Sequence, residues 1–195
     1  MAVLLSAGET VSLPGLKKVK VALGWEASPS NDPFDLDASC FMLGANNKVR
    51  DNNDLIFPNN KRSRCGSVVH QGDDKTGGDG DADNETIEIT LEQVPSDIVR
   101  LVFTASIHKA TAKGLNFGLV HRSFIRVIDL ERSEEISRFD LSTAAKVCKS
   151  VIFGELVREE GRGMWMFRAI GQGWEKELPD IAKDFGVIEQ RDTNG

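Results

Sequence analysis

Residues 72–85, GDDKTGGDGDADNE, carry six carboxylates and one lysine, a formal charge of −5 in a chain whose total is −6. Carboxylates so close in sequence repel one another unless a cation or basic side chains screen them. Asp79, Asp81 and Asp83 alternate with small residues, which lets a loop curl so that its side chains converge on a hard cation. The run is therefore either a solvated acidic loop or a metal-binding loop.

A second acidic segment, NDPFDLDAS at 31–39, precedes an apolar run. Asp35 and Asp37 are two residues apart, so on a strand they share one face. If the two acidic segments meet at one end of a sandwich, a cation between them offsets their repulsion. The candidate donors are carboxylate, amide and carbonyl oxygens, which favour Ca²⁺ over Mg²⁺ or a transition metal. An EF-hand is excluded because Thr86 stands where that loop needs glycine.

The elements that must position these acids are mostly short strands. In residues 86–92, TIEITLE, apolar and polar side chains alternate, as in a half-buried strand. Many such runs, separated by Gly, Asn and Asp, predict a mainly β protein, a two-sheet antiparallel β-sandwich with a few short helices. Short helices are expected within 109–116 and 177–186. We expect one domain over 1–195, with 191–195 a frayed tail. The predicted strands are 10–13, 18–25, 38–43, 54–57, 67–70, 86–92, 98–107, 123–130, 134–141, 150–156 and 164–171.

Composition excludes several classes of protein. A net charge of −6 argues against nucleic-acid binding, and no apolar run is long enough to span a membrane. The N-terminus lacks the basic region of a secretory signal. Three widely spaced cysteines without a CxxC pair favour a reducing compartment, so we expect a cytoplasmic protein.

The remaining reactive side chains have plainer interpretations. His70 ends a strand beside the acidic run and is more often a packed residue than a ligand. Cys40 lies in an apolar strand and is expected to pack there. Cys65 lies among basic residues in 61-KRSRC-65, which could lower its pKa. No nucleophile elbow, zinc-protease, P-loop or dinucleotide motif occurs.

Six blocks of the sequence carry a family resemblance: 34-FDLDAS-39, 57-FPNN-60, 66-GSVVHQGDDKTGGDGDADNE-85, 94-VPSDIVRLVF-103, 116-NFGLVHRSFIRVID-129 and 165-WMFRAIGQG-173. They resemble the TerD family of tellurium-resistance and general stress proteins, in that family's order and spacing. The resemblance covers residues from about Val11 to Gly173.

The resemblance implies a two-sheet sandwich that binds Ca²⁺ at its acidic loops. It also implies a cytoplasmic role in resistance to tellurite and other stresses, with partners among other proteins of the tellurium-resistance cluster, some of them membrane proteins. This sequence departs from the family pattern at four points. Pro58 stands where an aromatic residue is common before the two asparagines, and the acidic run has one extra residue near Gly78. Asp74 replaces an amide, and Asn84 replaces an acid. The implied metal ligands are Asp35, Asp37, Asn59, Asn60, Asp73, Asp81, Asp83 and Glu85.

The expected function is a calcium-ordered binding or adaptor module rather than an enzyme. One alternative is a metal-dependent enzyme acting on a toxic oxyanion, which would need an open coordination position. Another is a calcium-dependent carbohydrate-binding sandwich, which usually needs exposed aromatic residues near the ion and a secreted chain.

Overall fold

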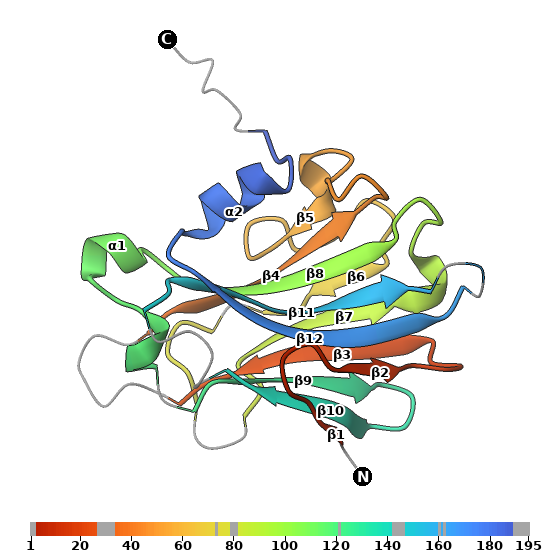
Figure 1. The fold of residues 1–195 in the computed structure, drawn as a ribbon, viewed down its shortest axis with the longest axis horizontal. Helices are drawn as coiled ribbons and strands as arrows, with labels where there is room; N and C mark the ends of the chain where they lie inside the picture. Colours follow the sequence, from red (N-terminus) through yellow and green to blue (C-terminus); the bar gives the residue numbers. More distant parts are fainter. Residues whose placement is uncertain are drawn as a thin grey trace.

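The computed structural model describes residues 3–26, 34–72, 74–78, 82–120, 122–141, 147–159, 161 and 163–188. Its strands form two six-stranded sheets that pack face to face (Figure 1). Sheet A contains β1 (Val3–Leu4), β3 (Lys18–Gly24), β6 (Val68–His70), β7 (Glu85–Thr90), β9 (Phe124–Asp129) and β10 (Glu134–Asp140). Sheet B contains β2 (Thr10–Ser12), β4 (Leu36–Leu43), β5 (Leu55–Ile56), β8 (Arg100–Ile107), β11 (Ser150–Arg158) and β12 (Trp165–Trp174). The short helices are α1 (Ala110–Lys113), α2 (Leu178–Asp184) and the 3-10 turns η1 (Asn52–Asp54), η2 (Leu91–Gln93) and η3 (Phe117–Leu119).

The strand order confirms the predicted sandwich. Sheet A runs β1-β10-β9-β3-β7-β6, and sheet B runs β2-β12-β11-β8-β4-β5. The described pairs are antiparallel apart from β1, which lies parallel to β10. Among the described residues, no helix has the length and apolar character needed to cross a lipid bilayer.

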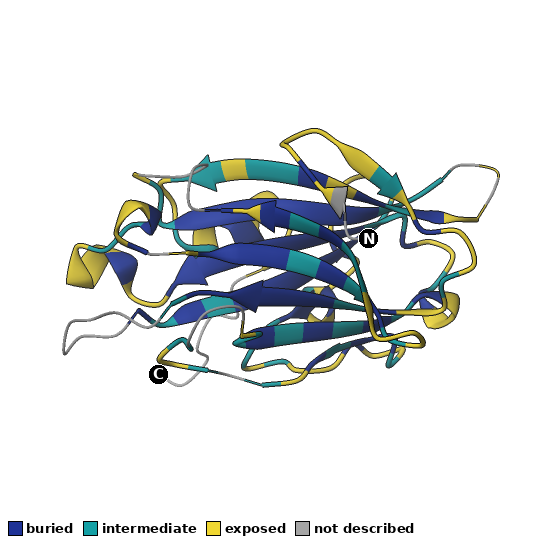
Figure 2. Ribbon diagram, turned by 90° about the horizontal axis from the view of Figure 1, so that it is seen from below, coloured by how far each residue is buried: buried dark blue, intermediate teal, exposed yellow. Residues whose placement is uncertain are grey.

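Alternation along the strands builds the core between the sheets. In β7, Ile87 and Ile89 are buried and the residues between them are half-buried, as the sequence predicts. Cys40 is also buried, and burial raises the pKa of its thiol, which confirms a packing role. Figure 2 shows buried strand centres, with the exposed positions concentrated in the turns and helices.

A second apolar cluster lies on the outer face of sheet B, because α2 covers that face. Ile181 and Ala182 of α2 pack with Phe41 and other sheet residues, and the rings of Phe41 and Phe185 are 4.8 Å apart. Gly186 follows the helix with φ of 89°, as expected for a residue that ends it. The helix therefore fixes residues 177–179 over the ends of β4 and β8.

The predicted strand 54–57 is only partly correct. Asp54 belongs to η1, and β5 keeps only two residues. Asp51 accepts a hydrogen bond from the Asn53 N–H at 2.8 Å, and Arg50 Nε lies 2.7 Å from Asp54 Oδ2. These local contacts favour a turn over an extended strand. The predicted frayed tail lies outside the described residues.

Candidate functional site

The two acidic segments meet at one end of the sandwich. The buried carboxylate of Glu85, at the start of β7, accepts a hydrogen bond from the Ala38 N–H of β4. Lys75 of the acidic run lines the same cavity as Asp35 and Asp37. Segments about 40 residues apart in the sequence are thereby held side by side, which is the arrangement that the acidic pattern predicts.

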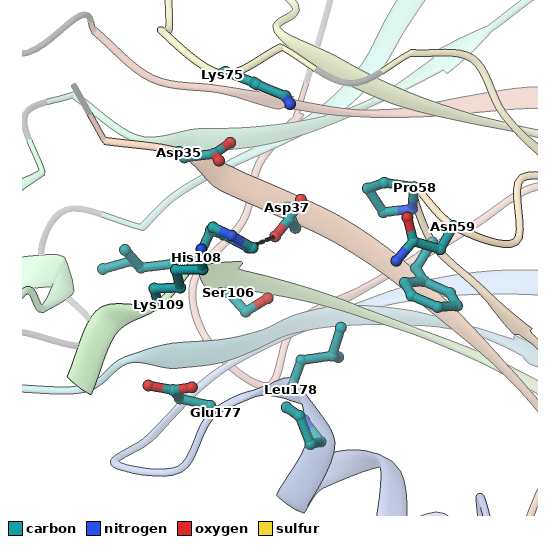
Figure 3. Close-up of a pocket in the computed structure, with 13 residues that line it drawn as sticks. Asp35, Asp37, Pro58, Asn59, Lys75, Ser106, His108, Lys109, Glu177 and Leu178 are labelled. Carbon is teal, nitrogen blue, oxygen red and sulfur yellow. Dashed lines mark ion pairs between the residues drawn. The ribbon is translucent and has the colours of Figure 1, made fainter. Parts of the chain in front are cut away.

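This cavity has a volume of about 370 Å³ and lies on the outer side of sheet B (Figure 3). Asp37 lies on β4 and Asp35 directly before it, while residues 177–179 at the start of α2 and the 57–59 turn form two of its walls. Roughly 300 Å³ is the lower end of the range for small-molecule sites, so the space exceeds what one ion needs. The lining residues are Asp35, Asp37, Phe57, Pro58, Asn59, Lys75, Ser106, Ile107, His108, Lys109, Glu177, Leu178 and Pro179.

Strand register places the acid groups of this cavity. Asp37 shares its strand face with Phe41 of the outer cluster, and it stands opposite Ser106 of β8. His108 donates its backbone N–H to the Asp35 carbonyl at 2.8 Å, and its Nδ1 lies 3.7 Å from Asp37 Oδ2. Pairing of β4 with β8 therefore carries both aspartates and the histidine to one place.

The paired asparagines have different environments. Phe57 and Asn60 exchange backbone hydrogen bonds of 3.1 and 2.9 Å, which closes the turn. The Asn60 side chain donates to the Leu55 carbonyl at 2.6 Å, whereas Asn59 lines the cavity. Asn60 thus supports the turn that presents Asn59.

Glu85 lies between the sheets rather than in the cavity lining. The strand β5 pairs only with Cys40 and Phe41, so it ends before it reaches Ala38. The Glu85 carboxylate accepts that Ala38 N–H, and its Oε2 lies 3.4 Å from Nε2 of buried His70. The carboxylate therefore ties β7 to β4 directly behind Asp37.

Asp83 lies on the opposite face of the molecule. Its carboxylate is 2.8 Å from Lys20 Nζ and 2.7 Å from Arg126 Nε, both on the outer face of sheet A. Although partial burial opposes it, hydrogen bonding to Arg126 and Lys20 lowers the pKa of Asp83. The structure does not bring this carboxylate together with Asp35 and Asp37.

Two of the departures from the family pattern, Asp74 and Asn84, contact each other. Asn84 Nδ2 donates to Asp74 Oδ2 at 3.0 Å, and Asn84 Oδ1 accepts the Trp25 N–H at 2.9 Å. Asp74 Oδ1 also accepts the Thr76 N–H at 2.9 Å, which holds the turn around Lys75. Asp74 and Asn84 thus form an acid–amide pair that joins the acidic run to the end of β3.

A family model described as the TerD domain matches residues 1–185. The chain belongs to the TerD family. It is 43% identical over 192 residues to the tellurium resistance protein TerD of Serratia marcescens, covering 96% of this chain and 98% of that protein. It is 40% identical over 193 residues to general stress protein 16U of Bacillus subtilis (strain 168), covering 96% and 98% of the two chains.

A solved structure shares the fold of this TerD-family chain. It is a homologue of telluride resistance protein (TerD) from Streptomyces coelicolor A3(2), with a TM-score of 0.71 and 23% identity. The match covers 86% of this chain and 96% of that chain. The family resemblance and the fold predicted from the sequence are both confirmed.

The described donors suit a hard cation. Asp35, Asp37 and Asn59 offer oxygen atoms, the donor type that Ca²⁺ and Mg²⁺ prefer. Within the described ranges no group of three or more His, Cys, Asp or Glu side chains is close enough to hold a metal. Asp73 and Asp81, also predicted as ligands, lie outside the described residues. The predicted ligand set as a whole therefore stays a prediction.

Sequence reasoning missed part of this cavity. His108, Lys109 and Ser106 come from β8 and the turn after it, and Glu177 comes from the segment before α2. The Glu177 carboxylate accepts the Thr111 N–H at 2.7 Å, and hydrogen bonding to Thr111 lowers its pKa. Only the pairing of β4 with β8 and the packing of α2 bring these residues to Asp37, and neither is visible in a local pattern.

Proposed function

We propose that this TerD-family chain is a Ca²⁺-binding stress-response protein that takes part in tellurite resistance as a non-catalytic binding or adaptor module. The observation that carries the proposal is the cavity lined by Asp35, Asp37 and Asn59, which come from two segments about 20 residues apart. Relatives at 40–43% identity are named tellurium resistance and general stress proteins, names that describe resistance rather than a catalysed reaction.

Within this proposal, Asp35, Asp37 and Asn59 hold the ion, together with Asp73 and Asp81 of the acidic run. Ca²⁺ is favoured over Mg²⁺ because Mg²⁺ keeps most of its water ligands. When bound, the ion supplies two positive charges that offset the repulsion among these carboxylates. Glu85, Asn60 and Asp83 support the surrounding structure through the contacts described above.

The proposed adaptor role depends on an ion that takes ligands from both acidic segments. Ligands drawn from both segments couple ion binding to the order of this end of the sandwich, which creates a surface for a partner. We place the partners among other proteins of the tellurium-resistance cluster, some of them membrane-associated, and the chain itself in the cytoplasm. Pull-down in Ca²⁺ and in chelator tests this step, and capture that ignores the ion would contradict it.

Calorimetric titration of calcium-depleted protein with Ca²⁺ tests whether the chain binds the ion. Wild-type protein should release or absorb heat with Ca²⁺, and Asp37→Asn should weaken the affinity by at least about tenfold. Asp83→Asn is the matched control, because it removes the same charge on the opposite face and should leave the affinity within about twofold. A wild-type chain that gives no calcium signal would remove the proposal.

A further inference from the structure

The cavity over β4 and β8 contains basic as well as acidic groups. Lys75 reaches it from the acidic run, and Lys109 from the turn after β8. Asp35, Asp37 and Glu177 are the acids of the same lining (Figure 3). Counting His108 as uncharged, these three carboxylates against two ammonium groups leave one net negative charge, and Asp73 and Asp81, which we propose as ligands of the same ion, bring it to three. One bound divalent cation reduces that charge to one net negative.

Size also separates this cavity from a simple ion site. Its volume of about 370 Å³ compares with roughly 30 Å³ for each water in the liquid. Phe57, Pro58, Leu178 and Pro179 give it apolar walls, and charge interactions beside an apolar wall are stronger than in bulk water. There is room for a small polyatomic ligand beside a cation.

The backbone holds both lysines in place. Lys75 lies in a turn closed by Asp74 Oδ1, which accepts the N–H groups of Thr76 at 2.9 Å and Gly77 at 3.3 Å. Lys109 adopts a left-handed conformation with φ of 53° directly before α1. A lysine in this conformation is uncommon, and here it reverses the chain at the cavity.

We infer that this cavity is a cation-dependent site for a small oxyanion, which Lys75 and Lys109 hold beside the metal. The inference rests on the proposed Ca²⁺ function, because the cation offsets most of the carboxylate charge at the cavity. An oxyanion matches this lining, since its oxygens accept hydrogen bonds from ammonium groups and are attracted by a divalent cation. Without the cation, the carboxylates repel the same ligand.

Calorimetric titration with sodium sulfate, and separately with sodium tellurite, tests this site. Each anion is added to calcium-saturated protein and to protein depleted of calcium by chelation and dialysis. We expect binding only in calcium. If both anions bind, the cavity is a general oxyanion site. If tellurite alone binds, the site is selective for tellurite. Either result supports the inference.

Substitution of the two lysines tests whether they bind the anion. Lys75→Ala with Lys109→Ala should weaken anion binding at least about tenfold, because each lysine supplies a charge-assisted hydrogen bond. Lys17→Ala with Lys18→Ala is the charge-matched control, because both lysines are exposed at the start of β3 in the other sheet, and it should leave the anion affinity within about twofold. The calcium affinity of each variant is measured in parallel.

The outcomes separate the inference from the function on which it rests. Calcium binding without an anion signal overturns the oxyanion site and leaves the calcium proposal standing. Anion binding that persists in depleted protein, or in the double lysine variant, also overturns it. A wild-type chain that binds no calcium removes both.

Discussion

Asp83 and Asp37 both come from strongly acidic stretches, yet they lie on opposite outer faces of the sandwich. On sheet A, Asp83 is held by Lys20 at 2.8 Å and Arg126 at 2.7 Å. On sheet B, Asp37 faces a cavity where His108 is 3.7 Å away, and histidine is charged only when protonated. Acids of the same type therefore occupy two kinds of environment.

The difference shows that acidic residues that are close in the sequence can have different roles in the structure. Part of the acidic run is neutralised by basic side chains on distant strands, and these contacts stabilise the fold. Glu155 of β11 is the extreme case of this kind, because its carboxylate is fully buried between Arg100 and Arg168. The acids of the cavity are those that we assign to ligand binding.

The largest effect is expected at Glu155. Glu155→Ala leaves two guanidinium groups close together without the carboxylate between them, so the free energy of unfolding should fall by about 3 kcal/mol. Urea unfolding in calcium and in chelator should show the same loss. Glu88→Ala, on the outer face of β7, is the control and should change stability by less than about 0.5 kcal/mol. A Glu155 loss that depended on calcium would contradict the separation of the two kinds of acid.

Asp83→Asn should lower the free energy of unfolding by about 1–2 kcal/mol at neutral pH, because two charge-assisted hydrogen bonds lose their charge. The pKa of Asp83 is lowered in the folded state from an ordinary value of 3.8. Its contribution is therefore fully present above that value and is lost as the pH falls through the lowered pKa. Acid titration of stability should be steeper below about pH 4 for wild type than for the variant. Equal slopes would show that the ion pairs do not form in solution.

Asn84→Asp should lower stability in chelator by about 1 kcal/mol, because it places a second carboxylate against Asp74. Adding Asp74→Asn restores an acid–amide pair in the reverse order and should recover most of the loss. Thermal unfolding of the two single variants and the double variant forms a double-mutant cycle. Additive effects in that cycle would mean that the 3.0 Å contact between these side chains contributes nothing.

The smallest effect is expected at Asp37 without the ion. Asp37→Asn should change the free energy of unfolding in chelator by less than about 0.5 kcal/mol, since the assigned role of this acid is in binding. In excess calcium the wild type gains stability through binding, and the variant should gain less. The measurement is the shift of the urea midpoint on adding calcium. A large loss in chelator would place Asp37 with Asp83 and Glu155 among the structural acids.

The sequence predicts the framework well because its signals are local. Alternation in 86–92 predicts β7, and the stripe of Ile181, Ala182 and Phe185 predicts α2. Buried Cys40 and His70 also agree with their predicted packing. Each of these features depends on neighbours within a few residues.

The candidate site is less predictable because its contacts are distant in sequence. Spacing alone groups Asp83 with Asp81, while the partners of Asp83 stand 63 and 43 residues away. Cys65 shows the same limit. Burial raises the pKa of the Cys65 thiol, but hydrogen bonds, including those to the Ser63 and Ser67 hydroxyls, together lower it by more, so that the pKa is lowered as predicted. The cause is these hydrogen bonds and not the basic residues next to Cys65 in the sequence. For both Asp83 and Cys65, the contacts made in the folded structure determine the properties of the side chain, and these contacts cannot be read from sequence spacing.

Residues 177–179, which form one wall of the cavity, follow all the strands of both sheets in the chain. Translation therefore completes the two sheets before it supplies that wall. A product cut short after Trp174 would retain every strand of the sandwich and lack the enclosure around Asp37. Because the same product lacks the α2 side chains that cover Phe41 on sheet B, we expect premature termination there to lower stability as well as to remove the capacity to hold a ligand.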